Sequence, residues 1–302
     1  MTATAARGDD SRSVRRITVD ADGLTLSGLL SEPEHTPTRA VVVALHGGGL
    51  HAGYFDARSR PGLSLLTLGS SLGYTVLALD RPGYGLSAAR LPLGQRLLDQ
   101  AASVRAALQD FASRHATGAG ILLLAHSFGS KVALGAAADL ADESLLGLDL
   151  SGIGHVYESE RPDPRDATQN GGWRRNWGPL RLYPPGTFQA GGVPAEPMPV
   201  QESADAASWP DRFHDLAPRV RVPVRLTFAE HESWWRHDPA TLTGLTGAFG
   251  AAPRVVVDRQ PDAGHNMSLG WAARSYHLRA LAFLEACLVA REINQPAAHP
   301  SW

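Results

Sequence analysis

The sequence predicts an α/β fold, in which a mostly parallel sheet is covered by helices on both faces. Short, continuous apolar runs occur along the chain and are typical of strands buried on both sides. Segments with helical apolar spacing lie between these runs, as expected of crossover helices that connect parallel strands. A third feature is a long stretch at residues 154–219, rich in proline, glycine and tryptophan and without a clear strand. We therefore predict one domain over residues 1–302, with a small cap or lid inserted at residues 155–218.

The composition is that of a globular chain with a large core. Hydrophobic residues make up 43% of the 302 positions, and the formal net charge is −2, so the charge balance does not favour nucleic acid or an acidic membrane surface as a partner. No apolar run is long enough to span a membrane, and residues 1–16 lack the apolar centre of a signal peptide. The single cysteine, Cys287, excludes an intramolecular disulfide. We expect a cytoplasmic protein.

The elements are predicted from local patterns in chain order. A disordered tail up to about residue 13 precedes a hairpin over residues 16–30, which turns at Asp22 and Gly23. The buried strands are expected at residues 40–45, 75–79, 121–125, 145–150, 222–229 and 254–258. The helices are expected at residues 63–72, 97–111, 130–140 and 276–287.

Two of these helices have a regular apolar stripe, with residues spaced alternately by four and three. The stripe of the first consists of Leu97, Ala101, Val104, Leu108 and Phe111, and that of the second of Tyr276, Ala280, Phe283 and Cys287. Because Cys287 is part of a stripe, we predict that it packs in the core and is not a reactive thiol.

The turn at residues 125–129, Ala-His-Ser-Phe-Gly, lies between a predicted strand and a predicted helix. A strand that reverses directly into a helix forces its central residue toward positive φ, at a cost of about 1–3 kcal/mol for a non-glycine residue. The flanking positions must then be small, as Ala125 and Gly129 are. Such a turn exposes the Ser127 hydroxyl and places the Phe128 amide at a helix N-terminus, where it can bind an oxyanion. The alternative is an ordinary turn with a capping serine.

Polar residues follow several of the predicted strands, at the sheet edge where open α/β sheets bind ligands. They are His46, Asp80, Ser127, Asp149, Glu230, Glu232 and His265. A serine nucleophile needs an imidazole base, and the imidazole needs a carboxylate that fixes its tautomer. The chain supplies these groups in the order serine, acid, histidine, with His265 as the candidate base.

This order, with a His-Gly-Gly-Gly motif at residues 46–49 and the serine turn in mid-chain, resembles the α/β-hydrolase superfamily. The resemblance covers about residues 17–290 but not the predicted cap. It implies that Ser127 is the nucleophile and His265 the general base. It also implies that the amides of Gly48 and Phe128 form the oxyanion hole.

The acid implied by the resemblance falls on Glu232, where aspartate is more usual. Glutamate is longer by one methylene, so its loop must lie further from the histidine. Glu230, two residues away, and Asp149, on an earlier strand, remain alternatives. The elbow also departs from the usual pattern, because Ala125 replaces its first glycine.

Two other site types are disfavoured by spacing. A dinucleotide loop beginning at Gly47 would, in a short-chain dehydrogenase, require a Tyr-x-x-x-Lys pair, but Ser127 stands four residues before the only lysine, Lys131. A zinc-protease motif at His231 would require a second histidine four residues later, and the next is His237.

The resemblance implies a serine hydrolase that cleaves an ester or related acyl bond of a small, largely apolar substrate through an acyl-enzyme. No cofactor, metal, nucleic acid or membrane partner is expected. We expect Gly49, His126, Trp173 and Trp177 to contact the substrate. The alternatives are a lyase or cyclase on the same scaffold, which eliminates an acyl group or abstracts a carbon-bound proton, and a ligand-binding protein with an inactive pocket.

Overall fold

The computed structural model describes residues 14–140, 144–159, 170–189 and 191–294, and the tail predicted up to residue 13 lies outside them. The strands are β1 (Val14–Asp20), β2 (Thr25–Ser31), β3 (Val41–Leu45), β4 (Thr75–Leu79), β5 (Ile121–His126), β6 (Leu145–Ser151), β7 (Val224–His231) and β8 (Val255–Gly264). The α-helices are α1 (Leu65–Ser71), α2 (Leu97–Arg114), α3 (Phe128–Ala138), α4 (Asn170–Trp177), α5 (Val200–Ala206), α6 (Trp209–Leu216), α7 (Pro239–Gly247) and α8 (Ala273–Asn294).

The described strands form one eight-stranded sheet with the order β1-β2-β4-β3-β5-β6-β7-β8. Strands β3 to β8 are parallel, whereas β1 and β2 form a hairpin that joins β4 in antiparallel fashion. The hairpin turns at Asp22 and Gly23, both at positive φ, as the sequence predicts. This mostly parallel sheet confirms the predicted fold class.

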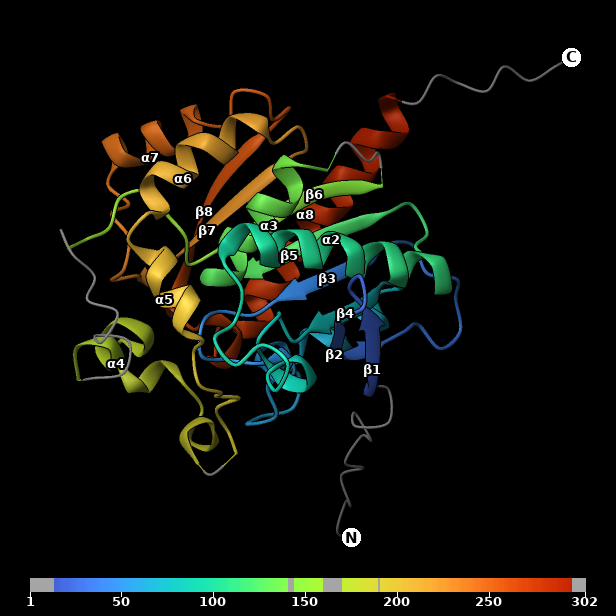
Figure 1. Cartoon of the computed structure of the whole chain (residues 1–302), viewed down its shortest axis with the longest axis horizontal. Coiled ribbons are helices and arrows are strands. Elements are labelled where there is room, and N and C mark those ends of the chain that lie inside the picture. The colour runs from blue at the N-terminus through green and yellow to red at the C-terminus, as the bar shows by residue number, and fades with distance from the viewer. Residues whose placement is uncertain (1–13, 141–143, 160–169, 190, 295–302) are drawn as a thin grey trace, which may run out of the picture.

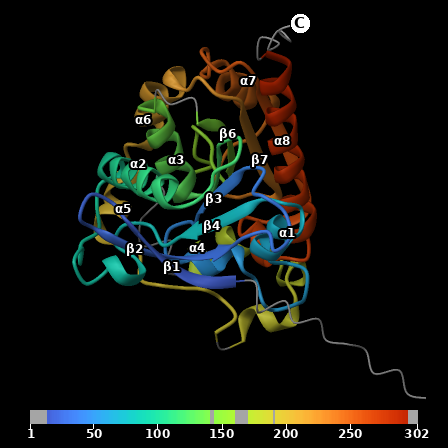
Figure 2. The ribbon, with the colours of Figure 1, turned by 90° about the vertical axis from the view of Figure 1, so that its right-hand side faces the viewer.

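Helices cover both faces of the sheet, with α1 and α8 on one side and α2, α3 and α6 on the other (Figure 2). The continuous apolar runs are explained by this arrangement, because successive side chains of a strand point to opposite faces. In β3, for example, Val43 packs with the α2 and α3 layer and Val42 with the α1 and α8 layer. Cys287 is buried in the α8 layer, and burial raises the pKa of its thiol to about 11. The packing role predicted for Cys287 is therefore confirmed.

The last two strands differ from the prediction at their ends. Strand β7 begins two residues later than expected and extends to His231, and β8 continues to Gly264 instead of ending at residue 258. Their pairing shifts register after Ala229 and resumes between His231 and Gly264, with Asp262 at φ 53°. Pro261 has no amide to donate to a regular ladder, and it lies where this pairing is irregular, as expected of proline at a bulge. Consequently Glu230 lies within β7, and His265 directly follows a strand.

Helices α2 and α8 extend beyond the expected ranges, and two further differences concern α3 and α7. Helix α3 begins at Phe128, two residues earlier than predicted, because Ser127 itself occupies the N-cap position. Helix α7 was not predicted, although Asp238 accepts hydrogen bonds from the amides of Ala240 and Thr241 and Pro239 occupies the first helical position. An Asp-Pro pair of this kind is a typical start signal for a helix. None of the helices in the described ranges is long and apolar enough to cross a membrane.

The segment at residues 155–218, here called the inserted segment, lies between β6 and β7 and contributes α4, α5 and α6. In Figure 1 it runs from α4 through α5 to α6 along one side of the molecule. Helix α6 packs on α3 with Trp209 and Phe213 in the core, so it belongs to a helix layer of the sheet. Helix α4 instead lies near the end of β8.

A cage of aromatic rings around Lys131 joins the inserted segment to α3. The buried Lys131 ammonium lies 5.2–5.7 Å from the ring centres of Phe128, Tyr157, Trp209 and Trp235. It donates a hydrogen bond to the Tyr157 hydroxyl at 3.1 Å, and that hydroxyl donates to a backbone carbonyl of the inserted segment. Cation–π contacts of this kind favour the charged lysine, but burial lowers the Lys131 pKa to about 7.

This pKa predicts how stability depends on pH. Between pH 7 and the unperturbed lysine pKa of 10.5, the folded chain binds fewer protons at Lys131 than the unfolded chain. The free energy of unfolding of the wild type should therefore rise with pH in this window, relative to Lys131→Met, by about 1.4 kcal/mol per pH unit. Urea unfolding of both proteins at about pH 6 and about pH 9 measures the change. A difference that stays constant across that range would contradict a depressed Lys131 pKa.

Candidate active site

The serine turn connects β5 to α3 and holds Ser127 at φ 53° and ψ −117°. This is the left-handed region that a non-glycine side chain occupies only under strain. The conformation is held from both sides, because the Ser127 amide donates to the Ser151 carbonyl and the Ser127 carbonyl accepts from the Ser130 amide. A Cβ atom at Gly129 would collide with the Leu45 carbonyl, so the close approach of α3 to β3 requires glycine there.

The turn brings Ser127 to a histidine and a carboxylate from the ends of two neighbouring strands. His265, after β8, places its Nε2 atom 3.1 Å from Ser127 Oγ. Its Nδ1 atom lies 2.8 Å and 3.1 Å from the two carboxylate oxygens of Glu232, which follows β7. Nδ1–H therefore donates to the carboxylate, and Nε2 is left to accept the serine proton. The Glu232 carboxylate is completely buried and the His265 side chain is 4% exposed, so water scarcely competes for these bonds.

Glu232 is held in its position by its own loop. Its Oε1 atom accepts hydrogen bonds from the backbone amides of Ser233 at 3.1 Å and Trp234 at 2.9 Å. Two amide donors stabilise the charge of a buried carboxylate and fix its orientation. The glutamate therefore presents a defined oxygen pair to the His265 ring despite its extra methylene.

The two alternative acids have other partners. The exposed Glu230 carboxylate accepts from the Asp262 amide at 2.8 Å, and this bond holds its pKa below the usual value. Asp149 is buried within β6 and forms an ion pair with Arg225 at 2.6 Å. Of the three candidate acids, the structure therefore places only Glu232 against His265.

The two backbone amides predicted to bind an oxyanion belong to Phe128 and Gly48. Phe128 is the first residue of α3, so its N–H has no acceptor within the helix. Gly48 lies in the loop after β3 and shares a cavity with Ser127. The amide of the next residue, Gly49, instead donates to the Tyr84 hydroxyl at 3.0 Å.

The cavity that contains Ser127 and His265 has a volume of about 320 Å³. The four residues expected to contact the substrate all line it, as do other residues of the inserted segment. The lining consists of Gly47, Gly48, Gly49, Leu50, His126, Ser127, Trp173, Asn176, Trp177, Val193, Ala195, Glu196, Pro197, Met198, His265 and Asn266. Two larger cavities, of about 720 and 730 Å³, contain neither Ser127 nor His265.

His126 lies at the back of this cavity. Its ring stacks on Tyr54, with centres 4.7 Å apart, and lies 4.7 Å from the His265 ring. Because the Ser151 hydroxyl donates to a backbone carbonyl, it accepts from His126 Nδ1–H at 3.2 Å. Burial lowers the His126 pKa well below the usual value, so a neutral ring supports the His265 imidazole.

Other residues of the site were not found by sequence reasoning. Asn176 and Met198 lie in the inserted segment, which has no periodic pattern from which their orientation could be read. Gly152, directly after β6, did carry a signal, because a glycine at a strand end often marks close packing. A Cβ atom there would lie 2.7 Å from the His265 ring and 2.9 Å from the His126 ring.

Comparison with known families identifies the fold. A model of the alpha/beta hydrolase family matches residues 42–282. The chain belongs to the alpha/beta hydrolase family. This confirms the resemblance inferred from the serine turn and the His-Gly-Gly-Gly motif, and family membership supports an enzyme. Comparison with curated protein sequences gave no match.

Solved structures share the alpha/beta hydrolase fold at low sequence identity. An N-acyl homoserine lactonase complexed with N-hexanoyl homoserine lactone has a TM-score of 0.66 and 14% identity, over 90% of this chain and 98% of that one. An enol-lactonase from Burkholderia xenovorans has a TM-score of 0.63 and 16% identity, over 90% and 98%. A thermophilic esterase from Thermogutta terrifontis has a TM-score of 0.58 and 17% identity, over 90% and 99%.

Proposed function

We propose that the protein is a serine hydrolase that cleaves an ester or related acyl bond of a small, largely apolar substrate. The observation that carries this proposal is the continuous chain of contacts from Ser127 Oγ through the His265 ring to the buried Glu232 carboxylate. A serine hydroxyl is a weak nucleophile, and an adjacent imidazole oriented by a carboxylate activates it.

In the proposed reaction, His265 Nε2 takes the proton from Ser127 Oγ as that oxygen attacks the substrate carbonyl carbon. The Glu232 carboxylate stabilises the imidazolium that forms. The amides of Gly48 and Phe128 donate to the oxyanion of the tetrahedral intermediate. His265 then gives its proton to the leaving oxygen, and the acyl group remains on Ser127. Attack by a water molecule, activated by the same imidazole, releases the acid and restores the serine.

The cavity supports a small, largely apolar acyl group. Its volume of about 320 Å³ lies at the lower end of the range for small-molecule sites. Trp173, Trp177 and Met198 of the inserted segment line it beside Ser127, and we propose that the segment acts as the cap of the site. Trp173 is 45% exposed whereas Trp177 is buried, so these rings reach from solvent to the interior. The activities named for the structural neighbours, esterase and lactonase, are consistent with ester cleavage.

Turnover, in heavy-oxygen water, of a short-chain ester whose alcohol part carries a proton β to the ester oxygen, such as a 2-(4-nitrophenyl)ethyl ester, can proceed by hydrolysis or by elimination and therefore tests hydrolysis directly. Water that attacks the acyl-enzyme should leave one labelled oxygen in the released acid, which mass spectrometry detects. A lyase that abstracts a carbon-bound proton and expels the carboxylate needs no water, so its acid product would be unlabelled. Parallel reactions without protein and with Ser127→Ala correct for spontaneous hydrolysis. Unlabelled acid from a reaction that depends on Ser127 would overturn the hydrolase proposal and favour elimination.

A further inference from the structure

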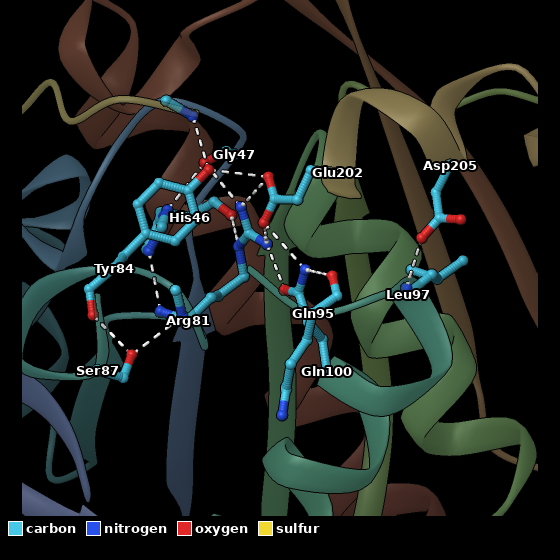
Figure 3. A network of polar contacts seen from close by, with 12 residues as sticks. His46, Gly47, Arg81, Tyr84, Ser87, Gln95, Leu97, Gln100, Glu202 and Asp205 are labelled. Atoms are coloured by element: carbon cyan, nitrogen blue, oxygen red, sulfur yellow. Dashed lines mark hydrogen bonds and ion pairs between the residues drawn. The ribbon is translucent and has the colours of Figure 1, made fainter. Parts of the chain in front are cut away.

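A buried ion pair joins the inserted segment to the loops beneath the cavity (Figure 3). Glu202, on α5, binds the Arg81 guanidinium with both carboxylate oxygens, at 2.5 Å and 3.2 Å. Both side chains are completely buried. Burying two charges costs more free energy of desolvation than their attraction recovers, unless further hydrogen bonds satisfy their polar atoms. The other hydrogen bonds of this pair therefore show which parts of the chain it fixes in place.

Arg81 binds the backbone of the loop that carries Gly48. Its Nη2 atom donates to the Gly47 carbonyl at 3.1 Å and its Nε atom to the His46 carbonyl at 2.7 Å. The His46 ring adds to this attachment. Its Nε2 atom accepts from the Arg81 amide at 3.0 Å, so Nδ1 carries the proton and donates to the Gly47 carbonyl at 2.8 Å. Two donors therefore fix the direction of the Gly47 carbonyl.

The direction of that carbonyl sets the direction of the Gly48 amide. The Gly47 C=O and the Gly48 N–H belong to one planar trans peptide, in which the two bonds point in opposite directions. With the carbonyl held on the Arg81 side, the Gly48 N–H points to the other side of the loop. Gly47, Gly48 and Ser127 line the same cavity, so the attachment of the Gly47 carbonyl determines whether the Gly48 N–H can reach the proposed oxyanion.

The peptide on the other side of Gly48 is attached to the same carboxylate through Tyr84. The Tyr84 hydroxyl accepts from the Gly49 amide at 3.0 Å and donates to Glu202 Oε2 at 2.8 Å. Burial raises the pKa of Tyr84, which keeps its hydroxyl protonated and able to donate. Glu202 thus holds the peptide planes before and after Gly48, one through Arg81 and one through Tyr84.

We propose that Glu202 is a positioning residue that sets the oxyanion hole through Arg81 and Tyr84, so that the inserted segment completes the catalytic site as well as covering it. This inference rests on the proposed serine hydrolase function. It implies that the Gly48 amide is correctly oriented only when α5 is docked. Glu202 acts on the transition state and not on substrate binding, because an oxyanion exists only after attack on the carbonyl.

A second attachment of α5 provides a matched control. Asp205, three residues after Glu202, accepts from the Leu97 amide at 2.7 Å and binds Arg96. Figure 3 shows this contact on the far side of α5 from Gly47 and Tyr84. Asp205→Asn therefore weakens the docking of α5 without touching the Gly48 loop.

The test compares Tyr84→Phe, Glu202→Gln and Asp205→Asn with the wild type on a short-chain aryl ester. An aryl trifluoromethyl ketone, whose adduct with the serine places an oxyanion in the hole, serves as the transition-state probe. We expect kcat to fall roughly tenfold in Tyr84→Phe and roughly a hundredfold in Glu202→Gln, with KM nearly unchanged, since removal of a whole donor costs about 10²–10³. Affinity for the ketone should fall in parallel. In Asp205→Asn both quantities should stay within about threefold of the wild type.

An equal loss of kcat in Asp205→Asn and Glu202→Gln would overturn the proposal, because α5 would then contribute only general packing. A loss expressed in KM with unchanged ketone affinity would overturn it too. Circular dichroism shows whether Glu202→Gln folds, and if it does not, Tyr84→Phe decides, since it removes one hydroxyl and leaves the ion pair intact. Absence of Ser127-dependent ester turnover in the wild type would instead overturn the proposed function, and this inference with it.

Discussion

Ser127→Ala is expected to abolish ester turnover, with a loss in kcat of at least about 10⁴-fold, while the fold is retained. The substitution removes the proposed nucleophile, and neither His265 nor Glu232 can replace it in acyl transfer. The strained backbone keeps its contacts, because Ser127 is held through its amide and carbonyl to Ser151 and Ser130. Within the described part of the chain, the hydrogen bond that is lost is the 3.1 Å contact between Ser127 Oγ and His265 Nε2.

Three measurements on this variant check the expectation. Steady-state turnover of an aryl ester should vanish, and the urea midpoint should stay close to that of the wild type. An organophosphonate should form an adduct on Ser127 of the wild type, located by mass spectrometry, and none in the variant. Ser130→Ala is a matched control, since this buried serine lies in the first turn of α3, three residues after Ser127, and donates to the Ser151 carbonyl without lining the cavity. Half or more of the activity retained in Ser127→Ala would exclude serine catalysis and favour proton abstraction by His265.

The central strands and the serine turn could be predicted because their signals are local. A strand buried on both faces must be apolar at every position, as residues 41–45 are. The turn at Ser127 requires glycine at position 129, where a Cβ atom would collide with the end of β3. The apolar strand pattern and the pair of small residues at positions 125 and 129 each span only a few residues, so these signals appear in the sequence itself, although the contact with β3 that explains Gly129 comes from a distant part of the chain.

The inserted segment and its contacts could not be predicted because they depend on distant residues. Glu202 is 121 positions from Arg81, and a single glutamate in a short helix gives no sign of such a partner. Likewise the extension of β8 through Pro261 depends on its pairing with β7, whereas the local apolar pattern ends at residue 258. Composition showed that residues 155–218 form something other than a strand, but not which side chains point into the cavity.

Glu232→Gln is expected to lower kcat by at least about a hundredfold, and Glu230→Gln by no more than a few-fold. Glutamine keeps the shape of Glu232 but removes the charge that stabilises the imidazolium, and its amide can present a donor to His265 Nδ1 and so select the wrong tautomer. The Glu230 carboxylate accepts a hydrogen bond from the Asp262 amide and is exposed to solvent, so its neutralisation leaves the bond between His265 and Glu232 in place. Both variants neutralise a glutamate at the end of β7, and the two positions are separated by one residue.

Glu232→Asp separates the charge of this group from its reach, and we expect kcat between those of the wild type and Glu232→Gln. Aspartate retains the charge but is one methylene shorter, so it cannot keep both the 2.8 Å contact with His265 and the 2.9 Å bond from the Trp234 amide. Steady-state kinetics of the three variants on one ester gives the ranking. If Glu230→Gln were the more damaging change, the path of the loop after β7 would have to differ from that described, and Glu232 would lose its assigned role. Equal activity of Glu232→Asp and the wild type would show that charge alone matters, and that the buried glutamate does not fix the ring by its length.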